Sequence, residues 1–240
     1  MNNMKFSGAG TIPAGEYNDI ACSGATKVNG NVTCKSFSAS GACGCSGNIE
    51  CLEDFKTSGS ISVDGDVKCS GNFKCSGSAK LKNVNADDIR ISGSLSATSL
   101  QGKSINISGG IRINGDVEGE NVNISGGGSI EGLLNAEIVS IKTGESLHIG
   151  SIGGTQIRVE ENVGSGDLRI FGFTFKNKVK NSKLTTESVE GDEIYLENTE
   201  ANVVRGKNVI IGTNCKINRV EYSGTYECHE TSTVKETVKL

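Results

Sequence analysis

Nine cysteines are the residues of this chain most able to do chemistry, and three of them recur at one spacing. Cys34, Cys51 and Cys69 each lie ten residues after the glycine of a Ser-Gly pair. A zinc site would need further ligands beside the paired Cys43 and Cys45, and the chain has no CxxC pair and no histidine before residue 148. An odd cysteine count also speaks against a disulfide framework. We therefore expect no metal, and reduced, buried thiols that act as small hydrophobic side chains.

Other reactive patterns are weaker. Residues 97–104 read ATSLQGKS, close to a phosphate-binding loop, but alternating apolar residues continue through Ile105 and Ile107. Such a loop needs a helix to begin at its lysine, and the alternation leaves no place for one. The two histidines, His148 and His229, are far apart in sequence, and the carboxylates sit mostly at turn positions. We therefore expect no catalytic residues, no nucleotide site and no cofactor.

The elements that hold these residues are set by a repeat. Ser-Gly pairs recur with steps of 17, 18, 18, 16, 16 and 17 residues, and their glycines are predicted corners: Gly24, Gly41, Gly59, Gly77, Gly93, Gly109 and Gly126. Self-similarity at a nearly fixed period of this size is typical of solenoids. Each unit cannot bury its own apolar face and has to stack on its neighbours.

Within each repeat, apolar residues alternate with polar ones, which is the pattern of a half-buried strand and not of a helix. The position four residues after the corner glycine is a predicted core position, for example Val28, Val63, Leu81, Ile113 and Ile130. Six residues after the corner, Gly or Asn marks a second corner, where we expect positive φ. The spacing predicts an all-β protein, a three-sided parallel β-helix with about 16–18 residues per coil.

Composition narrows the function classes. The net charge is −4, so the basic face that a nucleic-acid partner requires is not expected. No run reaches the length of a membrane span, and the first ten residues do not resemble a signal peptide. We therefore expect a cytoplasmic protein.

Four regions are expected along the chain. Residues 1–144 form β-helix coils, 145–188 an irregular or inserted region, 189–220 further coils, and 221–240 a polar tail or cap. The second region contains LRIFGFTFKNKVK. Its aromatic and basic residues suit either core packing or a protruding loop, 168–180, that docks on a protein partner or a membrane surface: Phe171, Phe173, Phe175, Lys176 and Lys178.

The iterated corners, as in ISGGIRINGDVEGENVNISG, and the string VEGDEIYLENTEANVVRGKNVIIGTNC at 189–215 resemble the bactofilin family of polymer-forming cytoskeletal proteins, in particular its longer Firmicute members. The resemblance implies a right-handed β-helix that assembles end to end without a nucleotide and serves as a scaffold in cell shape or motility. The long region at 145–188 and the C-terminal extension depart from the short members of the family.

A non-catalytic, self-associating scaffold is therefore the favoured function. The alternatives are an acyltransferase on a left-handed hexapeptide β-helix, for which the coil length drifts too much, and a secreted adhesin or polysaccharide-cleaving β-helix. Open strand edges pair with one another, and the expected tail would shield only the C-terminal end. We therefore predict association through the N-terminal end, with Phe6, Ile12 and Tyr17 as assembly residues. Replacing Phe6 and Ile12 by Arg is expected to leave the coils intact.

Overall fold

The computed structural model describes residues 2–161, 168–170, 173–175 and 182–240. The secondary structure of this part of the chain consists of strands: β1 (Asn2–Phe6), β2 (Gly10–Cys22), β3 (Ala25–Ala39), β4 (Ala42–Cys45), β5 (Ile49–Cys51), β6 (Phe55–Thr57), β7 (Ser60–Val63), β8 (Val67–Cys75), β9 (Ser78–Lys80), β10 (Asn83–Ile91), β11 (Ser94–Ala97), β12 (Ser99–Ile107), β13 (Gly110–Ile113), β14 (Val117–Ile124), β15 (Gly127–Thr143), β16 (Leu147–Glu161), β17 (Leu168–Ile170), β18 (Phe173–Phe175), β19 (Leu184–Leu196), β20 (Thr199–Ile211), β21 (Lys216–Tyr222), β22 (Tyr226–Cys228) and β23 (Thr233–Lys239).

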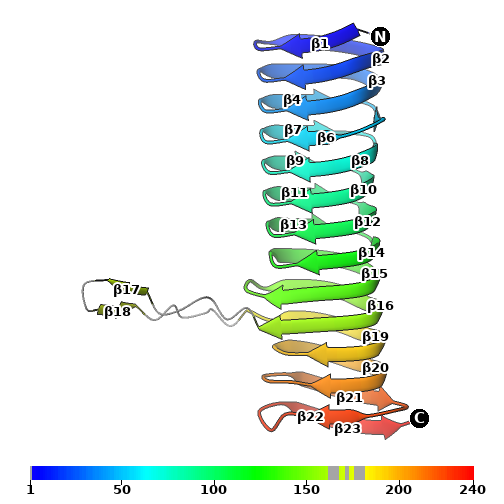
Figure 1. The fold of residues 1–240 in the computed structure, drawn as a ribbon, viewed down its shortest axis with the longest axis vertical. Coiled ribbons are helices and arrows are strands. Elements are labelled where there is room, and N and C mark those ends of the chain that lie inside the picture. Colours follow the sequence, from blue (N-terminus) through cyan, green and yellow to red (C-terminus); the bar gives the residue numbers. More distant parts are fainter. Residues whose placement is uncertain (1, 162–167, 171–172, 176–181) are drawn as a thin grey trace.

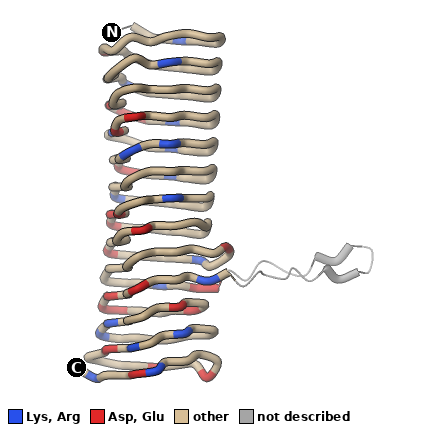
Figure 2. The backbone as a smooth tube through the Cα atoms, turned by 180° about the vertical axis from the view of Figure 1, so that it is seen from behind, with Lys and Arg blue, Asp and Glu red and all other residues tan. Residues whose placement is uncertain are grey.

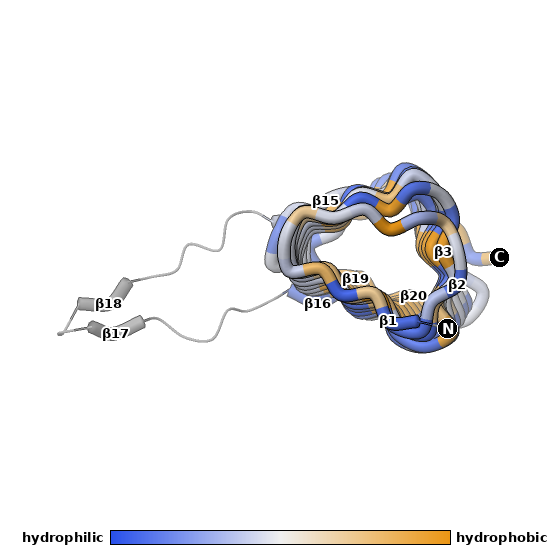
Figure 3. The backbone as a smooth tube through the Cα atoms, turned by 90° about the horizontal axis from the view of Figure 1, so that it is seen from above, coloured by the Kyte–Doolittle hydropathy of each residue, from blue (hydrophilic) through white to orange (hydrophobic). Residues whose placement is uncertain are grey.

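The strands wind into one parallel β-helix of about 13 turns, stacked along a single axis with the two termini at opposite ends (Figure 1). Each coil has three strand segments. The long strand β3 shows this directly, because its successive parts pair in parallel with β4, β5 and β6. Seen along the axis, the coils superimpose as one closed outline (Figure 3). The predicted all-β parallel β-helix is confirmed, and its handedness stays a prediction.

The core is a set of columns that run along the axis. Inward residues alternate with exposed ones, as in the burial pattern of β10, and residues one coil apart pair in register. All five core-repeat residues of the sequence analysis are buried, with exposures from 0% to 6%: Val28, Val63, Leu81, Ile113 and Ile130. Aromatic rings form one such column, since Phe55 stacks between Phe37 and Phe73 at centroid distances of 5.2 and 5.1 Å.

The corner glycines are required by stacking and not by backbone conformation. A Cβ built on Gly93 would lie 2.0 Å from the carbonyl oxygen of Gly77, one coil away. Every one of the seven Ser-Gly corners shows the same clash with the preceding corner. Of the second-corner glycines, Gly30 has a positive φ of 95°, whereas Gly47 and Gly65 do not and instead meet the coil before them. The expectation of positive φ at the second corner is therefore wrong for most coils.

The region 145–188 is more regular than expected. The strand β16 pairs in parallel with β15 before it and with β19 after it, so Leu147–Glu161 forms an ordinary coil and the stack resumes at Leu184. Between them, β17 and β18 form an antiparallel pair in a sheet of their own. Of the predicted docking residues, Phe171, Lys176 and Lys178 lie outside the described residues, and only the backbone of Phe173 and Phe175 is described.

Residues 221–240 differ from the predicted polar tail. The strand β22 pairs with β20, and β23 pairs with β21, both in parallel. The segment therefore forms the last coil of the stack, because Val234 and Thr237 occupy the columns of the buried Ile217 and Val220. Within the described ranges there is no helix long and apolar enough to cross a membrane.

Candidate assembly interface

The cysteine column is packed as small apolar side chains are. Cys34 Sγ lies 3.6 Å from Cys51 Sγ in the next coil, and both thiols are at most 1% exposed. Burial raises the pKa of the Cys69 thiol to about 12, which keeps it protonated and a poor nucleophile at neutral pH. All nine cysteines are free, and no cluster of metal-ligating side chains occurs among the described residues.

The other candidates for chemistry also lie on ordinary strands. The phosphate-loop-like segment 97–104 leads into β12, which pairs in parallel with β10 and β14. His148 is exposed, with its Nδ1 3.1 Å from the hydroxyl of Thr185. The features of this β-helix that are left for function are therefore its outer faces and its two ends.

The N-terminal end of the stack is an incomplete coil. The strand β1 covers only one side of the coil below it, where its residues pair with Tyr17–Cys22. Met4 and Phe6 of β1 are half-buried and pack on the core, and the Phe6 ring lies over Gly10, where an added Cβ would be 2.1 Å from its Cδ1 atom. Beyond β1, and beyond Gly10–Pro13 of β2, no further coil follows within the described residues, and the outer edges of these strands have no partner there.

Ile12 and Tyr17 are core residues, and this corrects their predicted role. Ile12 is 0% exposed and pairs with Val28, while Tyr17 is 7% exposed and donates a hydrogen bond from its hydroxyl to the carbonyl of Pro13 at 2.9 Å. The regular alternation begins at Gly10, so the first complete coil includes both side chains. Replacing Ile12 by Arg would place a charge in the core and would not leave the coils intact.

The C-terminal end of the stack is formed by β23. The amide of Thr233 donates to Cys215 and that of Leu240 to Tyr222, so β23 is fixed to the coil before it. Its far edge carries no further strand within the described residues. The half-buried Val234 packs on the core, whereas Leu240 is 67% exposed. Residues 221–240 therefore extend the stack by one coil, and β1 and β23 are alike in having no further strand beyond them within the described residues.

Ion pairs fasten the last coil from outside. The carboxylate of Glu221 accepts hydrogen bonds from Arg205 at 2.6 Å and Arg219 at 2.7 Å, and Arg219 also pairs with Glu236 of β23 at 3.1 Å. These two guanidinium groups hold the pKa of Glu221 below its usual value. The network spans three successive coils and stabilises the end coil without covering its edge.

Sequence reasoning missed Met4 and Val234, the inward residues of the two edge strands. The signal was present at the C-terminus, where TVKETVK places an apolar residue at Val234 and another at Val238. The high charge of the segment concealed it, because outward positions of an end coil are all solvated.

The fold defines a class: a parallel β-solenoid whose end strands, β1 and β23, have no further strand beyond them within the described residues. Residues 40–135 match the family model of bactofilin, described as polymer-forming cytoskeletal. This part of the chain is thus similar to the bactofilin family, and the resemblance seen in the repeats is confirmed.

Two relatives come from Bacillus subtilis (strain 168). The uncharacterized protein YhbF is 44% identical over 93 residues, which are 39% of this chain and 35% of the relative. The uncharacterized protein YhbE is 53% identical over 57 residues, 24% of each chain. The chain thus spans about a third and a quarter of the lengths of these relatives. No solved structure matches it.

Proposed function

We propose that this protein is a non-catalytic cytoskeletal scaffold whose units associate end to end. The observation that carries the proposal is the pair of open edges, β1 with β2 at one end and β23 at the other. Unpaired N–H and C=O groups at a strand edge are satisfied by another strand, and a second copy offers one with the same coil outline. The family match, to a polymer-forming cytoskeletal domain, supports the same function.

The core columns give each end an apolar component. At one end Met4 and Phe6 lie over the columns of Ile20 and Cys22, and at the other Val234 lies over that of Ile217. Stacking two ends would bury these half-exposed side chains and complete both ladders. Backbone pairing and apolar burial then act together, which is how a β-helix gains stability from each added coil.

The proposal extends to setting and partners. We assign the scaffold to the cytoplasm, with a role in cell shape or motility, as the resemblance to the bactofilin family implies. The segment 168–180, with its aromatic and basic residues, is the part of the sequence we propose for contact with a protein partner or a membrane surface.

Charges on the edge strands test end-to-end association. An inward-pointing charge is a natural device against edge pairing, so we would prepare Met4→Lys and Val234→Lys, singly and together. Arg112→Glu, exposed in the middle of the stack, is the matched control. Electron microscopy and light scattering of the wild type should show assemblies, and the double variant should be monomeric. A monomeric wild type at high concentration, or a double variant that assembles like the control, would contradict the proposal.

The single variants reveal the polarity of assembly. If like ends pair, blocking one end leaves dimers joined at the other. If unlike ends pair, blocking either end leaves monomers, because every contact uses one end of each kind. Dimers of the Val234→Lys variant would mean that the N-terminal ends pair with each other, as expected from the sequence.

A further inference from the structure

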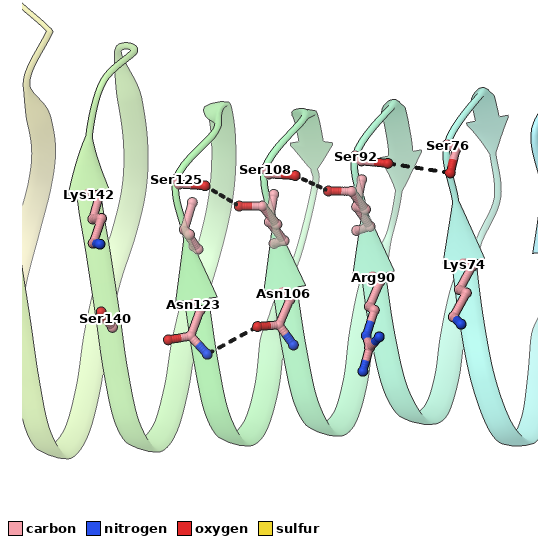
Figure 4. A pocket seen from close by; sticks show the side chains of 13 residues that line it. Lys74, Ser76, Arg90, Ser92, Asn106, Ser108, Asn123, Ser125, Ser140 and Lys142 are labelled. Carbon is pink, nitrogen blue, oxygen red and sulfur yellow. Dashed lines mark hydrogen bonds between the residues drawn. The ribbon is translucent and has the colours of Figure 1, made fainter. Parts of the chain in front are cut away.

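A groove lies along one side of the β-helix, away from both ends. It has a volume of about 690 Å³ and crosses the last segments of β8, β10, β12, β14 and β15. Two parallel rows of side chains line it (Figure 4). The strand row is Lys74, Arg90, Asn106, Asn123 and Ser140, and the corner row is Ser76, Ser92, Ser108, Ser125 and Lys142.

The lining is cationic at its ends and rich in hydroxyl and amide groups between them. Lys74 and Arg90 lie at one end and Lys142 at the other (Figure 4). The carboxylate that pairs with Arg90, Asp88 at 2.9 Å, is not among the lining residues, and in the part of the chain that the structure describes no other carboxylate lines the groove. Lys74 and Lys142 form no ion pair within the described part of the chain.

The floor keeps hydrogen-bonding groups toward solvent. Asn123 donates to Asn106 at 3.2 Å and Ser92 donates to Ser76 at 3.4 Å, whereas the hydroxyls of Ser108 and Ser125 donate to the backbone carbonyls of Ile91 and Ile107. The isoleucines between the two rows, such as Ile107, point into the core and are buried. Most of the corner edge itself is uncharged, whereas Lys, Arg, Asp and Glu concentrate along the opposite edge of the stack (Figure 2).

The cations have a defined separation. Lys74 pairs with Arg90, and the register continues through Asn106 and Asn123 to Ser140, two residues before Lys142. Four steps at a strand spacing of about 4.8 Å place the two cationic ends about 19 Å apart. An extended peptide rises about 3.3 Å per residue, so about six residues bridge this distance.

We propose that this groove binds an extended acidic peptide segment of a protein partner, with carboxylates about six residues apart that reach Lys74 with Arg90 at one end and Lys142 at the other. Small and polar residues between the carboxylates would lie over the serines and asparagines of the two rows. Because the charged side chains that line the groove are cationic, charge complementarity favours an anionic ligand. A single-stranded nucleic acid is disfavoured because no aromatic side chain lines the groove as a stacking platform.

The probe is a labelled, end-capped peptide of about seven residues with glutamate at its two ends and glycine and serine between. Fluorescence anisotropy with the full chain should show saturable binding that weakens as salt is added, since exposed charges are screened. A peptide of the same composition with its two glutamates adjacent should bind at least about threefold more weakly, because it cannot reach both ends. The same peptide with lysine in place of glutamate should not bind.

Paired variants locate the site. Lys74→Glu with Lys142→Glu should weaken binding at least about tenfold, since two attractive contacts become repulsive. Lys80→Glu with Arg112→Glu alters the net charge equally but on exposed residues outside the groove, and should leave binding unchanged. Circular dichroism melting should be the same for both pairs.

Four results would overturn the proposal. They are no saturable binding up to about 1 mM, equal loss in both variant pairs, equal affinity for the two glutamate spacings, and tighter groove binding of a uronic or sulfated oligosaccharide than of the peptide. None of them bears on end-to-end assembly, which is tested at residues of the two edge strands.

Discussion

Two blocks of coils fill the same outline with different side chains. In residues 25–75, the thiol–phenyl coils, the interior contains the stacked Phe37, Phe55 and Phe73 and most of the cysteines. In residues 78–141, the aliphatic coils, the same columns contain isoleucine, valine, leucine and alanine. The columns continue across the boundary, where Phe73 pairs with Ile89 and Cys75 with Ile91.

The difference between the two blocks shows how neighbouring columns of the core share a fixed volume. A large Phe55 is followed two residues later by the small Thr57, whereas the medium-sized Ile105 is followed by the medium-sized Ile107. Both pairs are buried in full on the same side of the coil. The backbone ladder fixes the outline, and neighbouring columns exchange volume within it, as close-packed cores allow when the total is kept.

The blocks also differ in coil length, and the corners absorb the difference. The steps of 18 residues in the first block become 16 after Gly77. The pairing of β8 with β10 shifts between Ala86 and Asp88, at a corner, and is regular on either side. Insertions at a corner leave the columns in register, so the two blocks stack without a break.

A buried charge should destabilise both blocks to a similar extent, and it should have the largest effect on stability. Val63→Asp in the first block and Ile113→Asp in the second should each cost about 3–5 kcal/mol, because both side chains are inward and an unpaired carboxylate would be buried. Ser62→Asp, exposed on the same strand, is the control. Far-UV circular dichroism melting measures the loss, and an unchanged melting temperature for either core variant would refute the assigned register.

High pH should separate the blocks, because residues 76–214 contain no cysteine. Burial raises the pKa of Cys75 to about 11 and of Cys69 to about 12, so the folded state retains protons that the unfolded chain releases above about 8.5. The stability is complete below that pH and falls as the pH rises, by about 1.4 kcal/mol per unit for each thiol.

At pH 10 this amounts to about 2 kcal/mol for each of the two thiols. Urea unfolding at pH 7.5 and pH 10, with limited proteolysis to locate the first opening, should show the thiol–phenyl coils weakened first. The variant with Cys69→Ala and Cys75→Ala should be less sensitive to alkali than the wild type. First opening in the aliphatic coils would contradict this account.

Exchange of volume between columns can be tested by converting one block into the other. Phe55→Ile should cost about 1–3 kcal/mol through a cavity, and Thr57→Ile should cost a similar amount through overpacking. Together they reproduce the isoleucine pair of the aliphatic coils, and the loss should be smaller than the sum by about 0.5–3 kcal/mol. The buried hydroxyl of Thr57 has no hydrogen-bond partner among the described residues, so its removal adds no polar cost. Strict additivity in denaturant melts would show that the two columns are independent.

The smallest expected effect is on the outer surface of the thiol–phenyl coils. Asp54 pairs with Lys56 at 2.7 Å and accepts hydrogen bonds from the backbone and side-chain nitrogens of Asn72, and these contacts hold its pKa well below the usual range. Its contribution is present above the ordinary pKa of about 4 and is lost as the pH falls further. Asp54→Asn should cost at most about 1 kcal/mol at pH 7 and flatten the acid limb of stability against pH. If the stability of the variant fell with acid as steeply as that of the wild type, groups other than Asp54 would be the cause of the acid dependence.

The interior of the coils could be read from the chain because alternation is local. A strand segment has two faces, so residues such as Val28 and Ile113 are assigned to the core by their neighbours two positions away. The period of 16–18 residues then states which residues share a column, and it also predicted the stacked Cys34 and Cys51. An end strand at the N-terminus followed from the fold class, and Phe6 was placed near it, whereas the edge strand at the C-terminus did not follow.

Contacts between coils were decided by the tertiary structure. The role of Gly93 depends on a carbonyl oxygen 16 residues earlier, and its own backbone conformation gives no sign of it. Ile12 is buried because it packs on the column of Val28, with the Phe6 ring over the nearby Gly10, although the segment is Gly-rich and contains Pro13. Residues 233–239 form a strand because β21 offers them an edge, in spite of their charge. Alternation and period follow from the sequence alone, whereas close approach, coverage and edge pairing depend on the distance between coils, which is set only when the coils stack.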